Sequence, residues 1–212
     1  NKTRNQCLST TNQTFIMKSL IWMIALVAAV LPHSFAYAGE RVLGTAGVSS
    51  VEGSGGGGLV PWAPIAGNGS ANQIGAVAFA SRLQFPSAYR LDVVGAALGI
   101  HERVELSAAR WSFSLADVVP GQEAEMNVFG AKFSLSGHAL YDQDRIWPQT
   151  SFGVQYKISG DKALVRQLGA QSGEGVDFFV SGTKFFLGAV RGFNALVNVT
   201  ARMTRANQFG LL

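Results

Sequence analysis

The sequence predicts an all-β fold, an antiparallel up-and-down β-barrel that crosses a membrane and follows a cleaved signal peptide. Three observations predict it. Apolar and polar side chains alternate with a period of two in most segments after residue 40, which is the period of a β-strand. Turns containing Gly, Asp or Pro separate these segments at the spacing of all-β folds, with no long amphipathic helix among them. The N-terminal region also contains a leader for export.

The leader starts at Met17. Lys18 gives it a basic start, residues 20–31 form a short apolar run, and Ala36-Tyr37-Ala38 has the small-x-small pattern of a signal-peptidase site. A membrane anchor is the alternative, but it needs about 20 apolar residues, which this run does not reach. We therefore expect three parts: an upstream extension that is not native (1–16), a signal peptide cleaved after Ala38 (17–38) and a β-barrel domain (39–212).

Two weak segments open the exported part. Residues 41–50 form a candidate strand, and the glycine-rich run at residues 53–58 follows it. That run matches the G-x-G-x-x-G spacing of a phosphate-binding loop, but such a loop must open a helix, and Pro61 and Pro64 oppose one. We therefore predict a flexible turn between extended segments.

The next strands are clearer. Residues 74–83 and 89–100 form a predicted strand pair around a turn. Residues 103–114 begin with regular alternation, which slips so that Trp111 falls in the opposite phase to the start of the segment. The slip predicts a β-bulge near Ala109-Arg110 or, alternatively, two shorter strands.

The second half of the chain alternates best. Strands are predicted at residues 129–135, 146–158, 176–187 and 194–204, and a short helix in a loop at residues 162–168, where good helix formers gather. In residues 146–158, one face carries two aromatic and two β-branched side chains, Phe152, Val154, Tyr156 and Ile158. Such a face suits contact with lipid or with a packed core.

Periodicity alone allows two environments. In a soluble sandwich the apolar face packs inward, whereas in an outer-membrane barrel it meets lipid and the polar face lines the interior. Small or polar residues on the opposite face and a lone cysteine, Cys7, outside the exported part both favour the barrel. Aromatic residues near strand ends favour it as well: Tyr89, Trp111, Tyr156 and Phe186. Because lipid cannot satisfy an open strand edge, such a sheet must close on itself.

Five charged residues fall on the predicted polar face and would face the lumen of a barrel: Glu105, Lys132, Lys157, Lys184 and Arg202. They either plug the lumen with salt bridges or provide a polar pore or charged interior for a small polar solute.

The net charge of +4 falls to +1 in the exported part, because Lys2, Arg4 and Lys18 precede residue 39 and 17 − 3 = 14 basic residues then face 13 acidic ones. Without a basic cluster, we expect no nucleic-acid partner.

No catalytic, cofactor-binding or metal-binding residues are predicted. His101 and His138 are far apart and lack the spacing of zinc ligands. Asp142 and Asp144 could hold Ca²⁺ in a loop, but the further ligands of an EF-hand are missing, so a simple turn is the preferred interpretation. No G-x-S-x-G elbow occurs. We therefore expect a protein that is not an enzyme.

Several blocks of the sequence stand out, in this order: Gly47-Val48-Ser49-Ser50-Val51-Glu52-Gly53, Gly57-Gly58-Leu59-Val60-Pro61-Trp62-Ala63, Val104-Glu105-Leu106-Ser107, residues 142–157 and residues 204–210. Together they resemble a family of exported Gram-negative proteins known as domain of unknown function 3034. The resemblance implies an outer-membrane β-barrel and supplies no functional residues. Members continue past the Phe-Gly-Leu-Leu at the end of this chain, and barrels usually end on an aromatic residue. Because the final residue is Leu212, we expect this chain to be truncated before its closing strands.

The leading expectation is an outer-membrane β-barrel with a porin-like, transport or structural role and no cofactor. Its expected partners are outer-membrane lipid and a small polar solute, and the sequence leaves the oligomeric state open. Two alternatives remain: a soluble periplasmic β-sandwich or lipocalin-like binder of small molecules, and an outer-membrane hydrolase.

Overall fold

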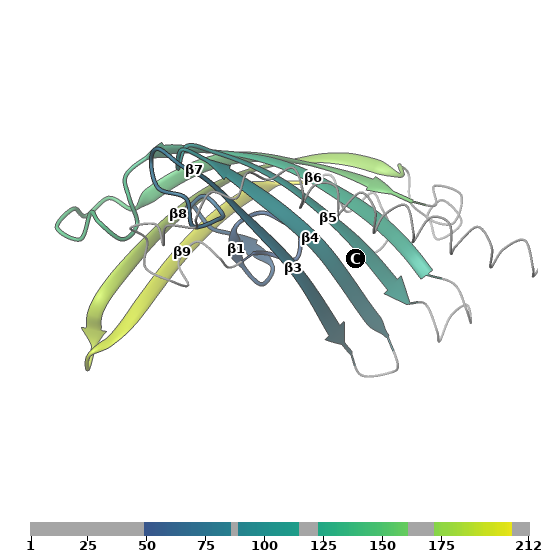
Figure 1. Cartoon of the computed structure of the whole chain (residues 1–212). Coiled ribbons are helices and arrows are strands. Elements are labelled where there is room, and N and C mark those ends of the chain that lie inside the picture. Colours follow the sequence, from purple (N-terminus) through teal and green to yellow (C-terminus); the bar gives the residue numbers. More distant parts are fainter. Residues whose placement is uncertain (1–48, 86–88, 115–122, 161–171, 205–212) are drawn as a thin grey trace, which may run out of the picture. The chain divides into compact units, whose positions relative to one another are not determined.

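The computed structural model describes residues 49–85, 89–114, 123–160 and 172–204, all within one compact unit that spans residues 38–212 (Figure 1). The predicted upstream extension, signal peptide and helix at residues 162–168 lie outside the described residues. No helix in the described ranges is long and apolar enough to cross a membrane.

Seven antiparallel strands form the main sheet, in the same order as in the sequence. They are β3 (Ile74–Gln84), β4 (Arg90–Ile100), β5 (Val104–Ser114), β6 (Glu123–Ser136), β7 (Gln149–Ser159), β8 (Glu174–Val190) and β9 (Phe193–Met203). Figure 1 shows that this sheet curls into a half-barrel. The all-β, antiparallel, up-and-down part of the prediction is therefore confirmed. The two edge strands, β3 and β9, have no second strand partner among the described residues.

Two hairpins have short turns. Residues 101–103 join β4 to β5, and residues 191–192 join β8 to β9. The φ angle is positive at His101 (50°), Glu102 (53°), Arg191 (49°) and Gly192 (86°). Positive φ at both central positions defines the type I′ turn, whose twist matches that of the flanking strands. These turns keep consecutive strands adjacent and so produce the simple strand order.

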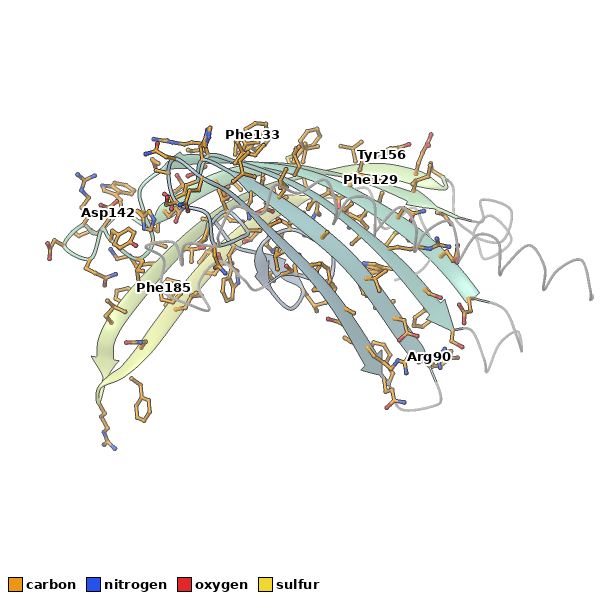
Figure 2. All side chains as sticks on the ribbon, in the orientation of Figure 1. Arg90, Phe129, Phe133, Asp142, Tyr156 and Phe185 are labelled. Atoms are coloured by element: carbon orange, nitrogen blue, oxygen red, sulfur yellow. The ribbon has the colours of Figure 1, made fainter. Side chains whose placement is uncertain are left out.

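Apolar side chains cover the outer, convex face of the sheet. The large exposed ones include Leu98, Leu106, Phe129, Phe133, Phe152, Tyr156, Phe178, Val180, Val197 and Val199. Figure 2 shows Phe129, Phe133 and Tyr156 on this outer side. The alternation predicted for residues 129–135, 146–158 and 194–204 matches the burial along β6, β7 and β9, where each strand has one exposed apolar face and one more buried face. The middle prediction began too early, because β7 starts at Gln149.

The bulge predicted near Ala109-Arg110 is wrong. Strand β5 keeps a regular register with both β4 and β6 along its whole length. Trp111 and Phe113 lie on the inner, concave face together with Glu105, because that face itself changes from charged to apolar along the strand. They pack there against a buried apolar cluster of Val51, Leu91, Val93, Ala109 and Val128.

Residues 49–66 lie against the concave face, and we call them the inner segment. It contains β1 (Gly56–Gly57) and β2 (Val60–Pro61), which pair antiparallel beneath the curved sheet (Figure 1). The predicted strand at residues 41–50 falls mostly outside the described residues, and Ser49 and Ser50 form only isolated bridges, to Gly55 and Gly58. The inner segment thus covers the inner face of the sheet.

Candidate functional site

The first charged contact on the inner face is an ion pair between neighbouring strands. Glu105 of β5 lies directly opposite Lys132 of β6 in the strand register. The Nζ atom of Lys132 is 2.8 Å from Oε2 of Glu105, and each side chain is only 1% exposed. Two charges this deeply buried are costly unless they are paired and hydrogen-bonded.

The inner segment provides those additional hydrogen bonds to Lys132. The Nζ atom donates to the backbone carbonyl oxygens of Gly55, Trp62 and Pro64, at 3.1, 3.1 and 2.8 Å. These carbonyl groups lie on both sides of the β1–β2 turn. A single ammonium group therefore binds three separate points of the inner segment to the sheet.

Glu105 binds the inner segment through its two carboxylate oxygens. Oε1 accepts hydrogen bonds from the hydroxyl of Ser54 at 2.7 Å and the backbone N–H of Gly55 at 2.9 Å, and Oε2 accepts one from the N–H of Ala66 at 2.6 Å. Both charges of the ion pair are thereby satisfied by backbone and hydroxyl groups in place of water.

A second charged cluster involves Glu52 of the inner segment. Its carboxylate is 2.5 Å from Nζ of Lys157 on β7 and accepts hydrogen bonds of 2.8 and 2.5 Å from Nη1 and Nη2 of Arg202 on β9. Asp177 of β8 lies between these strands, with Oδ2 2.8 Å from Nζ of Lys157 and Oδ1 accepting a 2.6 Å hydrogen bond from the hydroxyl of Thr204. Glu52, Lys157 and Asp177 are buried.

Neutral hydrogen bonds hold the rest of the inner segment. The carbonyl oxygen of Pro61 accepts hydrogen bonds from the hydroxyls of Ser181 and Thr200, at 3.0 and 2.8 Å. The backbone N–H of Ala63 donates to Thr183, and the indole N–H of Trp111 donates to the carbonyl of Val51. Together with the charged contacts, these bonds connect the inner segment to every strand from β5 to β9.

The structure brings together four of the five charged residues that the sequence placed on the polar face. Glu105 and Lys132 form one cluster, and Lys157 and Arg202 belong to the other. Two acidic members, Glu52 and Asp177, were not predicted. The predicted set of four bases and one acid was unbalanced, and this imbalance was the signal that acidic partners were missing.

Lys184 lies apart from both clusters, which corrects its predicted position. Strand β8 pairs regularly with β9 from Phe178 through Phe186, so its facing does not change between Val180 and Lys184. Lys184 therefore has the same facing as Val180. Its Nζ atom donates to the backbone carbonyls of Asp142 and, at 2.6 Å, of Arg145 in the loop between β6 and β7. Its role here is to hold that loop.

Asp142 also organises that loop through its side chain, because Oδ2 accepts a 2.8 Å hydrogen bond from the backbone N–H of His138. Across the part of the chain that the structure describes, no three His, Cys, Asp or Glu side chains gather closely enough to hold a metal ion.

The fold and the site define an all-β protein whose antiparallel sheet forms a half-barrel around its own inner segment. The chain belongs to the family Protein of unknown function (DUF3034), which matches residues 45–212. The family resemblance found in the sequence is thereby confirmed. No curated protein and no solved structure matches the chain.

Proposed function

We propose that this protein is an exported outer-membrane β-barrel protein whose polar interior is closed by its own inner segment. The observation that carries the proposal is the polarity of the two faces of the sheet. The inner face buries ion pairs, while the outer face exposes large apolar side chains such as Phe129 and Val199, which are 53% and 71% exposed. A soluble sandwich or lipocalin-like protein would bury its apolar face instead.

The distribution of charge on the outer face supports contact with lipid. In β3 to β6, the outer-face charges are confined to one end of the sheet, near the β3–β4 and β5–β6 connections. They form ion pairs there, including Arg82 with Asp92 at 2.6 Å and Arg110 with Glu125 at 2.6 Å. Arg90 marks this end in Figure 2. An apolar band with charges beyond its end is the pattern of a strand surface that crosses a bilayer.

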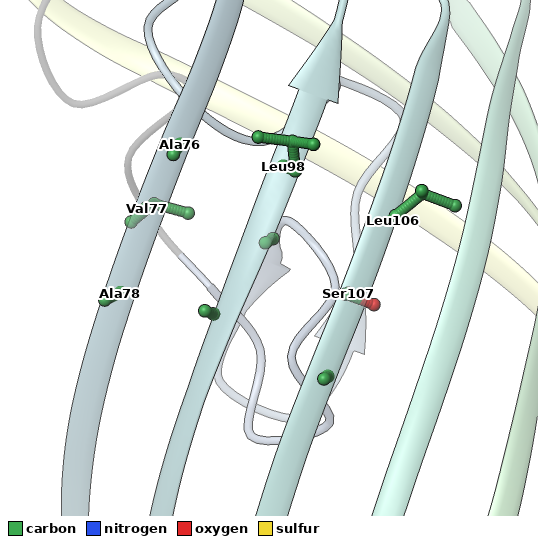
Figure 3. Close-up of a pocket in the computed structure, with 9 residues that line it drawn as sticks. Ala76, Val77, Ala78, Leu98, Leu106 and Ser107 are labelled. Carbon is green, nitrogen blue, oxygen red and sulfur yellow. The ribbon is translucent and has the colours of Figure 1, made fainter. Parts of the chain in front are cut away.

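The outer face also has the shape that acyl chains can fill. A shallow apolar depression lies over β3, β4 and β5, where the side chains are small (Figure 3). Ala76, Ala78, Ala96 and Ala108 line it, with Leu98 and Leu106 beside them. Among the described residues, the outer edges of β3 and β9 have no second strand partner. In lipid these edges must also be paired, because the hydrocarbon offers no hydrogen-bond partners.

The inner segment favours a closed interior at rest. It joins the sheet through two buried charge clusters and a set of backbone hydrogen bonds. In this proposal a solute passes along the inner face only after these contacts have broken. We therefore propose a structural or gated transport role, and porin-like conduction only after the inner segment has moved.

Membrane fractionation and gel migration before and after boiling test this proposal. We expect the mature chain in the outer-membrane fraction, with faster migration of the unboiled protein. Recovery as a water-soluble monomer in the periplasm, with no shift on boiling, would refute the proposal. The apolar outer face would then have to be covered in another way.

A further inference from the structure

The charges on the inner face of the sheet do not balance by themselves. Five charged side chains of the strands take part in the two clusters, and the three bases exceed the two acids by one: Lys132, Lys157, Arg202, Glu105 and Asp177. Glu52 is the only charged residue between positions 49 and 73, and it meets this excess at Lys157 and Arg202. The inner face of the sheet therefore carries one positive charge in excess. The carboxylate of Glu52, in the inner segment, neutralises it.

The contacts of Glu52 depend only on its carboxylate. Arg202 binds both oxygens through Nη1 and Nη2, and Lys157 contacts Oε1. A guanidinium that binds two oxygens, supported by an ammonium group, is a general arrangement for recognising carboxylates. Another carboxylate could make the same contacts.

A neutral side chain beside these groups has unused hydrogen-bonding capacity. Gln155 lies two residues before Lys157 on the same face of β7 and directly opposite Asp177 in the register of β7 and β8. It is 0% exposed, and neither Oε1 nor Nε2 has a hydrogen-bond partner among the described residues. Buried amide groups are normally paired, so Gln155 is available to a polar ligand at this point.

We propose that Lys157 and Arg202, with Gln155 beside them, form a binding site for a small carboxylate, and that Glu52 occupies this site as an internal competitor. A carboxylate solute that replaces Glu52 releases this charged contact of the inner segment. The role of such a solute in opening the interior rests on the proposed function above, whereas its binding to the inner face does not.

Chemical rescue of Glu52→Ala with formate tests the site. The variant lacks the internal carboxylate, and formate is small enough to take its place. We expect formate to raise the thermal midpoint of the purified full-length variant with saturation, by roughly 5–10 °C at about 100 times its dissociation constant. Chloride at equal ionic strength is expected to give no saturable rise, and the wild-type protein no comparable response to formate.

Two control variants identify the groups responsible. Glu123→Ala removes a carboxylate from an exposed position, its side chain being 50% exposed, and should gain nothing from formate. Glu52→Ala combined with Arg202→Gln removes the guanidinium and should lose the rescue.

Three results would overturn the site: no formate response in Glu52→Ala, an equal response in Glu123→Ala, or full rescue without Arg202. If Glu52→Ala does not fold alone, the yield of folded protein with formate becomes the readout, where recovery supports the site and continued failure refutes it. Fractionation tests the membrane location separately, so either proposal can fail without the other.

Discussion

Lys132→Met tests how strongly the buried ion pair binds the inner segment. The substitution leaves Glu105 buried without its counter-charge and removes the donor for the carbonyls of Gly55, Trp62 and Pro64. Loss of one partner of a buried ion pair costs about 3–5 kcal/mol. We expect a loss of that size in the free energy of unfolding, measured by urea denaturation in liposomes and followed by tryptophan fluorescence.

A second substitution separates the charge from the packing. Adding Glu105→Gln to Lys132→Met removes the unpaired charge but keeps an acceptor for the inner segment, so the double variant should recover at least about 1 kcal/mol. Arg110→Met is the exposed control, since the Arg110 and Glu125 side chains are 57% and 39% exposed, and should change stability by less than about 1 kcal/mol. A cost below 1 kcal/mol for Lys132→Met, or no recovery in the double variant, would refute the reasoning.

Three further pairs of substitutions test other parts of the structure by the same unfolding measurement. Val197→Arg, on the outer face, should lower the free energy of unfolding in liposomes by about 2–4 kcal/mol, whereas Val197→Leu should leave it nearly unchanged. Equal losses for the two variants would contradict contact of this face with lipid. Arg191→Asn should stabilise the type I′ turn by up to about 1 kcal/mol and Arg191→Val should destabilise it, so the opposite order would exclude this turn type. Gly153→Ala should lower the free energy of unfolding by about 1–3 kcal/mol, because the new Cβ would meet the ring of Phe179. Gly182→Ala should lower it less, because a Cβ at that position would make only ordinary contacts. A smaller loss for Gly153→Ala than for Gly182→Ala would show that Phe179 does not cover Gly153.

Sequence alternation identified the facing of strands whose two sides differ along their whole length. β7 is the clearest example, with Phe152 and Tyr156 outside and Ser151 and Lys157 inside. Alternation did not predict the facing of residues along β5. Trp111 and Phe113 lie on the same inner face as Glu105, but they contact the apolar cluster around Val51. The change in polarity comes from the covering segment and not from the backbone of the strand, so periodicity alone could not show it.

The packing of the inner segment against the sheet could not be predicted from the sequence. Its glycine-rich run was expected to be a flexible turn, but residues 53–56 are buried, and Gly53 packs against Ala108 and Ala109 with a φ angle of 93°. A positive φ and a close approach to the sheet both favour glycine at this position. The run has no periodicity that would reveal such contacts, and Glu52 beside it belongs to no predicted strand. The excess of bases over acids on the predicted polar face was the one feature of the sequence that indicated a missing acidic partner.

Spin labels on neighbouring residues of β9 test the central claim most directly. Because residues 39–212 contain no cysteine, single labels can be placed at Val199, on the outer face, and at Thr200, on the inner face. The two labelled proteins are compared in liposomes for collisions with oxygen and with a water-soluble nickel chelate. We predict that the label at Val199 collides readily with oxygen and little with the chelate, while the label at Thr200 is shielded from both by the inner segment. Ready access of the chelate to Val199 would place the apolar face in water and contradict the account.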